Sequence, residues 1–335
     1  MRAFIEISKE NLIYNYKTIK DKVGKDIICV IKSNAYGHGL IEVARTLAPL
    51  NPKMFAVSTL EEASLIRKNL IFTPILFLGT CDNLSFASNY RITLTIVSID
   101  YLKTLVSANL PIFVHILINT GMNRDGIAEN EIDEALELIK NSKLLLRGIF
   151  THFASNETYE KQNELFENIL NKIPHDKLLI HSQASSTFLN ENKVSNAVRV
   201  GLVLYGLSDV LELKPVLSLK TYPICINKVL KDETVSYDSE IIESDGYVYT
   251  LPIGYADGLN RTIKISVFAN ESYYEQIGVI CMDHTMIFSK EKLPLQTCFE
   301  LIGEHITVQD IANKNATISY EIVTKLSPRL KRNLK

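Results

Sequence analysis

Six residues in the first 210 positions combine a type that can do covalent chemistry, move protons or hold an anion with a place at an apolar run. Four of them stand at the end of such a run or in the polar segment directly after one, and the last two lie within one. A lysine amine can bond to a carbonyl cofactor, and a neighbouring histidine or arginine can stabilise charge. A serine hydroxyl and a glycine N–H can together hold a phosphate. In chain order the six are Lys32, Arg124, His152, Ser185, Arg199 and Gly201.

The elements that must position these residues alternate in type from about residue 9 to 218. Eight short runs rich in β-branched residues are predicted as strands, and most are apolar throughout, as strands covered on both faces are. Apolar residues recur at helical spacing between them, for example in Glu129–Lys140. The predicted strands are Ile27–Lys32, Met54–Ser58, Ile75–Leu78, Leu94–Val97, Ile112–Asn119, Arg147–His152, Lys177–His181 and Ala197–Val203.

Eight strand–helix units in roughly 200 residues fit a (β/α)8 barrel. A doubly wound sheet would give the same succession of elements, so the pattern favours the barrel without excluding that alternative. The carboxyl ends of barrel strands share one face, and the loops after strands 7 and 8 commonly bind phosphate. This arrangement predicts a phosphate site at Ser185 and Gly201 with Lys32 opposite, which indicates pyridoxal phosphate as the cofactor.

The pattern changes after about residue 219, where strand-like segments follow one another without helices between them. This predicts a mainly β second domain over residues 219–335. Two short helices are expected at Thr307–Ala312, with Thr307 as the cap, and at Tyr320–Lys325, and the basic C-terminal residues are expected to form a solvated helix end. The predicted strands are Leu219–Val229, Gly246–Pro252, Thr262–Phe268, Gln276–Cys281, Thr285–Ser289 and Thr297–Ile302.

The ten residues Val30–Gly39, VIKSNAYGHG, closely resemble the segment that carries the cofactor lysine in alanine racemases. The resemblance covers essentially the whole chain. It implies a (β/α)8 TIM-type barrel over residues 9–218 followed by a mainly β C-terminal domain, which residues 1–8 would join. Further matches follow in the same order at Thr120–Arg124 (TGMNR), Arg199–Gly206 (RVGLVLYG), Pro252–Gly258 (PIGYADG), Cys281–Asp283 (CMD) and Thr317–Glu321 (TISYE).

The resemblance also implies an activity, the interconversion of L-alanine and D-alanine, which would supply D-alanine for peptidoglycan. Two bases would move protons at Cα of the substrate bound to pyridoxal phosphate. Lys32 would be one base and Tyr237 the other, and lysine and tyrosine are residue types whose reference pKa values in model peptides are near 10. The family forms homodimers with shared active sites. Tyr237, Tyr255 and Met282 would therefore reach the cofactor of the partner subunit, where Tyr255 narrows the entry path and the Met282 backbone N–H binds substrate.

The cofactor contacts also follow from the resemblance. Lys32 would carry the cofactor, and Arg124 would bind both its phenolic oxygen and the substrate carboxylate. Arg199 would face the pyridine nitrogen, and His152 would lie beside the ring and form a hydrogen bond with Arg199. Because arginine does not give up its proton, the ring nitrogen would stay neutral, which limits transamination. The phosphate would be held by Tyr36, Ser185, Gly201, Leu202 and Tyr320.

The chain departs from the family pattern at three positions. Leu117 occupies the place where many relatives carry a carbamylated lysine that orients the arginine, so Asn119 or a bound anion is expected to orient Arg124 here. Ala184 replaces an asparagine that often precedes the serine of the phosphate site. Asp238 stands where a glycine usually follows the catalytic tyrosine.

Other functions remain open at this point. A racemase of the same fold acting on serine, lysine or a broad set of amino acids would carry the same motifs, because pocket volume decides the substrate. A fold-related amino-acid decarboxylase is a second alternative, and release of CO2 would identify it. A non-catalytic protein that binds pyridoxal phosphate is a third, although such relatives are single barrels and this chain has a β domain with Tyr237 and Met282.

Composition sets the remaining expectations. The 335 residues carry a net charge of −2, and 46% of them are hydrophobic. No clustered basic excess indicates nucleic-acid binding, and no apolar run reaches the ~18 residues of a membrane span. Five scattered cysteines form no C-x-x-C pair, which predicts neither a metal site nor a disulfide framework and suits a reducing compartment. With no apparent signal peptide, the protein is expected in the cytoplasm.

Overall fold

The computed structural model describes residues 2–208 and 210–335, and within them the chain divides into two compact units. The first, called the barrel unit, consists of Asn15–Ala35 and Val43–Leu204. The second, called the β unit, consists of residues 2–14, Tyr36–Glu42 and 205–335 apart from Asp209.

The barrel unit contains eight parallel strands that close into a ring, which confirms the expected (β/α)8 barrel. Each strand pairs in parallel with the next, and the last pairs with the first, Arg199 opposite Ile28. Most strand residues are fully buried, as their continuous apolar runs predict. The strands are β2 (Asp26–Val30), β3 (Met54–Val57), β4 (Ile75–Phe77), β5 (Ile92–Ile96), β6 (Phe113–Leu117), β7 (Leu145–Phe150), β8 (Leu179–His181) and β9 (Ala197–Val200).

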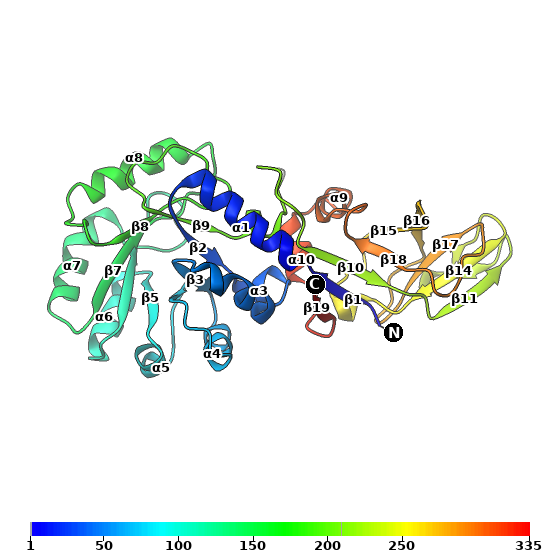
Figure 1. Cartoon of the computed structure of the whole chain (residues 1–335), viewed down its shortest axis with the longest axis horizontal. Coiled ribbons are helices and arrows are strands. Elements are labelled where there is room, and N and C mark those ends of the chain that lie inside the picture. Colours follow the sequence, from blue (N-terminus) through cyan, green and yellow to red (C-terminus); the bar gives the residue numbers. More distant parts are fainter. Residues whose placement is uncertain (1, 209) are drawn as a thin grey trace. The chain divides into compact units, whose positions relative to one another are not determined.

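One helix precedes β2, and helices follow each strand from β2 to β7, most of them on the outside of the ring (Figure 1). Several begin at a side chain that accepts a hydrogen bond from the first turn, as Thr59, Asn83 and Ser98 do for α4, α5 and α6. The helices are α1 (Lys9–Val23), α2 (Lys32–Tyr36), α3 (Leu40–Leu47), α4 (Leu60–Lys68), α5 (Leu84–Asn89), α6 (Ile99–Ser107), α7 (Ile132–Lys140) and α8 (Tyr159–Leu170).

Several strands end earlier than predicted. β2 ends at Val30, two residues before Lys32, and β7 ends at Phe150, two residues before His152. Gly201 lies directly after β9 and not within it. The predicted ends were too long because an apolar run does not mark where the hydrogen-bonded ladder stops. These residues therefore belong to the loops at the carboxyl ends of the strands.

The β unit is built on one nine-stranded sheet in the order β11-β14-β17-β16-β15-β18-β10-β1-β19. Neighbouring strands are antiparallel except β1 and β19, which are parallel to each other, and β1 lies between β10 and β19 (Figure 1). The strands are β1 (Phe4–Ile7), β10 (Leu217–Thr221), β11 (Cys225–Val229), β14 (Gly246–Leu251), β15 (Ser266–Ala269), β16 (Ser272–Ile277), β17 (Thr285–Ser289), β18 (Phe299–Ile302) and β19 (Lys331–Leu334).

Smaller elements complete the β unit. β12 (Thr234–Val235) and β13 (Glu240–Ile241) form a separate hairpin, and two helices, α9 (Val308–Lys314) and α10 (Ser319–Thr324), lie where helices were predicted. The Thr307 side chain accepts a hydrogen bond from Asp310 N–H, as expected of a cap. Residues 2–8 lie in this unit with β1, whereas Met1, which the sequence assigns with them, lies outside the described residues.

Two predictions for this unit were wrong. Leu219–Val229 is not one strand but parts of β10 and β11, because the chain breaks at Pro223, which has no N–H for a ladder. The basic C-terminal segment is not a solvated helix end. Lys331–Leu334 form β19, and the Arg332 guanidinium is half-buried and donates to the carbonyls of Leu326 and Leu330. No helix of the described chain is long and apolar enough to cross a membrane.

Candidate active site

The chain turns sharply after β2 in a left-handed segment. Ser33, Asn34 and Ala35 have φ of 54°, 54° and 53°, and Tyr36 has φ of 53°. This conformation costs an L-residue roughly 1–2 kcal/mol, so the surroundings must hold it. Ala35 N–H donates to Ile31 O (2.9 Å), and Asn34 N–H donates to Glu62 Oε1 (3.0 Å). Strain of this kind is typical of functional sites, and here it begins directly after Lys32.

Lys32 is only partly exposed, and its pKa is lowered. Burial is the main cause, and the positive charge of Arg124 adds to it, whereas the carboxylates of Glu62 and Asp125 oppose both. A lowered pKa increases the share of neutral amine, which is the form that attacks a carbonyl carbon. The environment of Lys32 therefore suits covalent attachment of a carbonyl cofactor.

A buried chain of hydrogen bonds runs through the barrel from Arg199. Its guanidinium donates to His181 Nδ1 (2.8 Å) and to His152 Nδ1 (3.1 Å), the second being the contact that the resemblance implies. Because arginine only donates, both Nδ1 atoms accept, and neutral His181 carries its proton on Nε2. That proton is shared with His115 Nδ1 at 2.9 Å.

All three histidines are held in the neutral form. Burial, followed by the charge of Arg199, lowers the pKa of His115 and His152 to about 3. The pKa of His181 is lowered for the same reasons. The positive charge in contact with His152 is therefore carried by Arg199 and not by the imidazole, and the charges of Arg124 and Lys32 add to its effect on the pKa of His152. Sequence reasoning missed His115 and His181, although a histidine inside an apolar run of a buried strand was the available signal.

Arg199 itself is fully enclosed. Its two terminal nitrogens carry four protons and lie within hydrogen-bond distance of five acceptors, so one proton is shared; the three other acceptors are the carbonyls of Thr151, His181 and Ser182, and all five are neutral. Its guanidinium carbon lies 5.0 Å from the centre of the Phe150 ring. The guanidinium is thus fixed at the carboxyl ends of β7, β8 and β9, with its charge uncompensated by any of these partners.

The loop that carries Arg124 is shaped by Asn119. The Asn119 side-chain oxygen accepts from the N–H of Gly121 (3.0 Å) and of Asn123 (3.1 Å). The Arg124 side chain itself pairs with Asp125, Nε to Oδ1 at 3.2 Å. Asn119 thus orders the backbone of the loop that carries Arg124, whereas the guanidinium itself meets Asp125. Orientation of Arg124 by a bound anion, the alternative expectation, stays a prediction. Leu117 is buried at the end of β6.

Residues expected at the phosphate are found in both units. In the barrel unit, Gly201 N–H donates to Ser185 Oγ (3.0 Å), and Leu202 comes next in the loop after β9. Ala184, which precedes the serine, donates its N–H to Thr187 Oγ1. In the β unit, the rings of Tyr36 and Tyr320 lie 5.8 Å apart between centres.

Tyr255 and Met282 are brought together in the β unit by backbone hydrogen bonds. Tyr255 N–H donates to Cys281 O and Ala256 N–H donates to Met282 O, both at 3.0 Å. A Cβ on Gly254 would lie only 2.3 Å from Cys281 O, so glycine is required for this close approach. The side chains of Tyr255 and Met282 are 41% and 55% exposed.

Tyr237 lies in a tight turn between β12 and β13 and is 67% exposed. The turn is attached next to the Tyr255 and Met282 segments, because Ser236 Oγ donates to Val279 O (3.0 Å). Asp238 has φ of 66° and ψ of 5°. This left-handed conformation explains why a glycine usually follows the tyrosine and why aspartate, which tolerates it, can replace that glycine.

The structure thus places the expected site residues in two sets. The barrel unit holds Lys32, Arg124, His152, Ser185, Arg199, Gly201 and Leu202 at the carboxyl ends of its strands. The β unit holds one pair, Tyr36 with Tyr320, and one group, Tyr237 with Tyr255 and Met282.

Comparison with known proteins covers both units. Residues 7–209 match the family model of the alanine racemase N-terminal domain, and residues 216–334 match that of the C-terminal domain. The chain is 35% identical to alanine racemase from Fusobacterium nucleatum over 99% of both chains, and 32% identical to alanine racemase 1 from Bacillus subtilis over 98% of this chain and 92% of the relative.

Solved structures give the same result. Alanine racemase from Clostridium difficile 630 has a TM-score of 0.93 at 30% identity, covering 100% of this chain and 96% of that one. Alanine racemase from Bacillus anthracis with bound L-Ala-P has a TM-score of 0.92 at 30% identity, covering 100% and 95%.

Proposed function

The chain belongs to the alanine racemase family, and we propose from this premise that it interconverts L-alanine and D-alanine with pyridoxal phosphate as its cofactor. The observation that carries the proposal is the environment of Lys32, a half-buried amine of lowered pKa at the start of a strained turn. Such an amine is suited both to hold a carbonyl cofactor and to move a proton. The product D-alanine would serve peptidoglycan synthesis.

The residues of the barrel unit fit the cofactor. Ser185 Oγ and the N–H groups of Gly201 and Leu202 would hold its phosphate after β8 and β9, where barrels commonly bind one. Tyr36 and Tyr320 would add their hydroxyls. Arg199, fixed by five neutral acceptors, would meet the ring nitrogen as a donor that keeps its proton. When bound, pyridoxal phosphate supplies an electron-withdrawing ring that acidifies Cα of the substrate.

The chain's own residues would then bind the substrate and move the proton. Arg124 would hold the substrate carboxylate and the phenolic oxygen of the cofactor, with its loop ordered by Asn119. The Lys32 amine would take or return the proton on one face of Cα. Tyr237 would serve the opposite face, and the fixed charge of Arg199, beside neutral His152, would stabilise its phenolate.

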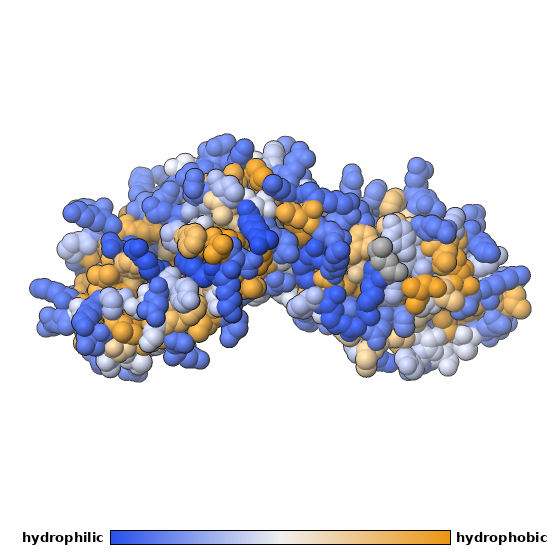
Figure 2. All heavy atoms as spheres, turned by 60° about the horizontal axis from the view of Figure 1, so that its bottom comes forward, coloured by the Kyte–Doolittle hydropathy of each residue, from blue (hydrophilic) through white to orange (hydrophobic). Residues whose placement is uncertain are grey.

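We propose that two domains have separate roles in the reaction. The barrel, residues 9–218, binds the cofactor, and residues 219–335 with 1–8 supply the second base and the substrate contacts. Tyr237, Tyr255 and Met282 are 67%, 41% and 55% exposed, which is unusual for aromatic and thioether side chains with assigned roles. In the face drawn in Figure 2, apolar atoms also reach the surface over the end of the β unit that holds β11, β14 and β17. Both features support a homodimer in which a second copy covers these residues and shares the site.

Two features bear on the setting and the substrate. All five cysteines are free thiols, and we propose a cytoplasmic location because a reducing compartment suits them. Alanine is proposed over serine, lysine or a broad set because the relatives carry that name. A chiral assay of all common L-amino acids would settle the substrate.

The central experiment is reductive labelling. Purified protein supplied with pyridoxal phosphate is treated with borohydride and mapped by peptide mass spectrometry. The adduct is expected on Lys32, and Lys32→Ala should carry none and show no racemisation. An adduct on another lysine, or release of CO2 in place of the opposite enantiomer, would overturn the proposal.

A further inference from the structure

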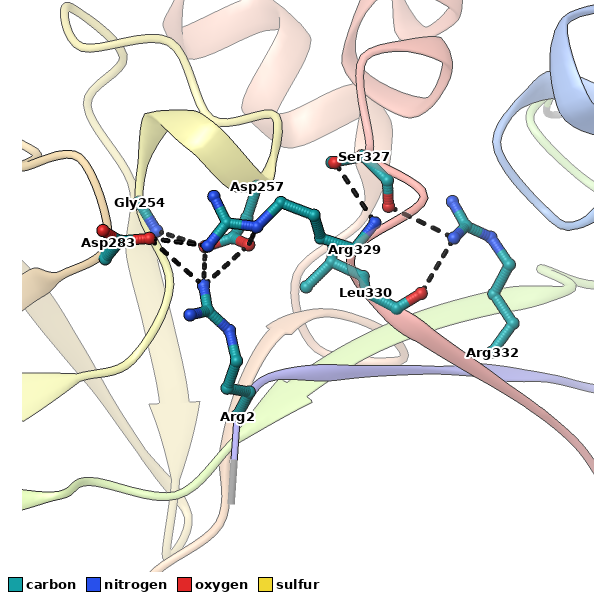
Figure 3. A network of polar contacts seen from close by, with 8 residues as sticks. All are labelled: Arg2, Gly254, Asp257, Asp283, Ser327, Arg329, Leu330 and Arg332. Atoms are coloured by element: carbon teal, nitrogen blue, oxygen red, sulfur yellow. Dashed lines mark hydrogen bonds and ion pairs between the residues drawn. The ribbon is translucent and has the colours of Figure 1, made fainter.

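Asp257 is a buried carboxylate at the centre of a polar network in the β unit (Figure 3). Its side chain is fully enclosed and accepts from Arg2 Nη2 at both oxygens, at 2.9 Å and 2.8 Å. It also accepts from Gly254 N–H at 3.1 Å, and Arg329 Nε lies 3.6 Å from Oδ1. Removing a buried carboxylate from water is costly, so a structure that retains one must hold it by several partners.

The same two arginines reach a second carboxylate. Arg329 Nη2 donates to Asp283 Oδ1 at 2.7 Å, and Arg2 Nη2 lies 3.4 Å from the same oxygen. Arg332 holds the turn that presents Arg329, because its guanidinium donates to Ser327 O (3.2 Å) and Leu330 O (2.9 Å), as Figure 3 shows. Two cations from the ends of the described chain therefore bridge two carboxylates from its middle.

These carboxylates belong to the segments that carry Tyr255 and Met282. Asp257 is two residues after Tyr255, and Asp283 directly follows Met282. The two segments also contact through the backbone hydrogen bonds described above and the close approach at Gly254. A displacement of Asp257 or Asp283 would therefore also displace the segment that carries Tyr255 or Met282, the residues expected to contact substrate. The two arginines lie on other elements.

We propose that Arg2 and Arg329 are positioning residues for the substrate: through Asp257 and Asp283 they fix the Met282 backbone N–H and the Tyr255 ring where substrate is bound. This inference rests on the proposed racemase function. It assigns the arginines no contact with substrate or cofactor. Their loss should weaken substrate binding while the proton transfers between Lys32 and Tyr237 continue.

The test separates substrate binding from turnover. Arg2→Met and Arg329→Met are each expected to raise KM for L-alanine and D-alanine about tenfold with kcat within about threefold, the pattern of lost uniform binding. Arg2→Lys, which keeps a cation, should recover most of the loss. The matched control is Lys220→Met, which breaks the Lys220–Glu6 ion pair (3.0 Å) in the same sheet and should leave KM unchanged.

The possible outcomes distinguish failure of the proposed racemase function from failure of the positioning role of Arg2 and Arg329. Wild-type protein that racemises no amino acid overturns the proposed function. An active wild type with unchanged KM in both methionine variants, or a KM shift equal to that of Lys220→Met, overturns the positioning role alone. If Arg2→Met does not fold, Arg329→Met decides, because it leaves Arg2 on Asp257. If a variant only lowers the amount of folded protein, and the enzyme that does fold has a normal KM, that result also contradicts the positioning role.

Discussion

The Arg199 side chain can only donate hydrogen bonds, and this fixes protons on residues well beyond its own contacts. His152 and His181 must accept at Nδ1, so each carries its proton on Nε2, and His181 passes the same requirement to His115. A proton added to either of the first two rings would put a donor against a donor. The barrel interior therefore favours one protonation state of each histidine.

This arrangement predicts that acid weakens the fold. The folded pKa of His115 is about 3 and its unfolded value is near 6.5, so the unfolded state binds more protons between these values and stability falls as pH drops through this window. Between pH 7.5 and 5.5 each such histidine should cost about 1.4 kcal/mol of unfolding free energy. Urea unfolding of wild type and His115→Gln at both pH values measures the change in unfolding free energy between pH 7.5 and pH 5.5. This change should be smaller in the variant by about 1.4 kcal/mol, because the variant lacks one such histidine.

Thr95→Val is the matched control. Thr95 is buried opposite His115 on β5, and its hydroxyl donates to Phe77 O (2.7 Å), so the variant loses a core hydrogen bond but no titrating group. It should lower stability by about 1 kcal/mol at both pH values and leave the difference unchanged. If both variants reduce the change in unfolding free energy between the two pH values equally, His115 is not the source of the pH dependence.

A second residue-scale prediction concerns the two bases. In this family the lysine is expected to serve the D-enantiomer and the tyrosine the L-enantiomer. Tyr237→Phe should therefore abolish exchange of the Cα proton of L-alanine with deuterium, whereas exchange from D-alanine persists at a reduced rate. Racemisation should fall by at least ~10²–10⁴-fold, as is typical of a lost acid or base.

Nuclear magnetic resonance of each enantiomer, incubated separately in deuterated buffer, measures these exchange rates. Tyr255→Phe serves as the comparison, because Tyr255 is the other exposed tyrosine of the same group. Equal loss from both enantiomers would contradict the assignment of faces. Unchanged racemisation in Tyr237→Phe would move the second base to Tyr255.

At the scale of elements, helix α4 supports the left-handed turn after Lys32. The Glu62 carboxylate accepts from Asn34 N–H (3.0 Å) and Ser58 N–H (3.1 Å), and its charge raises the pKa of Lys32 against the effects of burial and Arg124. Glu62→Gln should therefore lower the pKa of Lys32 further. In a plot of the rate of cofactor attachment against pH, the acid limb, where the rate falls as Lys32 is protonated, should then move to lower pH. The weaker acceptor should also cost about 1 kcal/mol of stability.

Absorbance of the apo protein after mixing with pyridoxal phosphate, over a range of pH, follows the attachment rate. Glu61→Gln is the control, because Glu61 is exposed in the same first turn of α4. A shift of the acid limb toward higher pH, or the same shift in both variants, would show that the Glu62 charge does not act on Lys32.

The sequence predicted the elements that depend on burial. The strands of the barrel were found because residues covered on both faces must be apolar, and α9 was found with its Thr307 cap. β19 was missed because Lys331 and Arg332 suggest solvent, although an edge strand needs no apolar run. The left-handed turn at Ser33–Tyr36 could not be predicted, since its φ values are stabilised by contacts with Ile31 and Glu62 and not by residue preference.

The candidate site divides in the same way. Residues within recognisable motifs, such as Lys32 and Arg199, could be named from the sequence alone. Their supports were not named. His115 stood out as a histidine in an apolar run, but its partner His181 is 66 residues away in the sequence. The sequence places Asp125 beside Arg124 without showing that their side chains pair. Asp257 stood inside a recognised motif, yet nothing in the sequence indicated that Arg2 would bind it.

At the scale of the whole molecule, the prediction is that activity requires two chains. Lys32→Ala and Tyr237→Phe should each be inactive as homodimers, because each lacks one base. Mixed dimers contain one site with both bases intact, so activity should return to at most half of the wild-type value per dimer. Co-expression with two affinity tags isolates the heterodimer, and its racemisation rate is the measurement.

Pairing two copies of Lys32→Ala through the same tags gives the control and should remain inactive. Verified heterodimers without activity would contradict a shared site and would place both bases within one chain.

The pairing of β1 with both β10 and β19 has a consequence for the order in which the molecule assembles. Strands β2 to β9 have all been synthesised by residue 200, so the barrel can close while the remaining chain is still on the ribosome. Leu217–Thr221 of β10 are synthesised soon afterwards and can pair with one edge of Phe4–Ile7. The other edge must wait for Lys331–Leu334, which at typical translation rates of about 5–20 residues per second arrive roughly 5–22 seconds after β10. Throughout that interval one edge of β1 has no partner, and the β unit, which contains the earliest strand, is completed last.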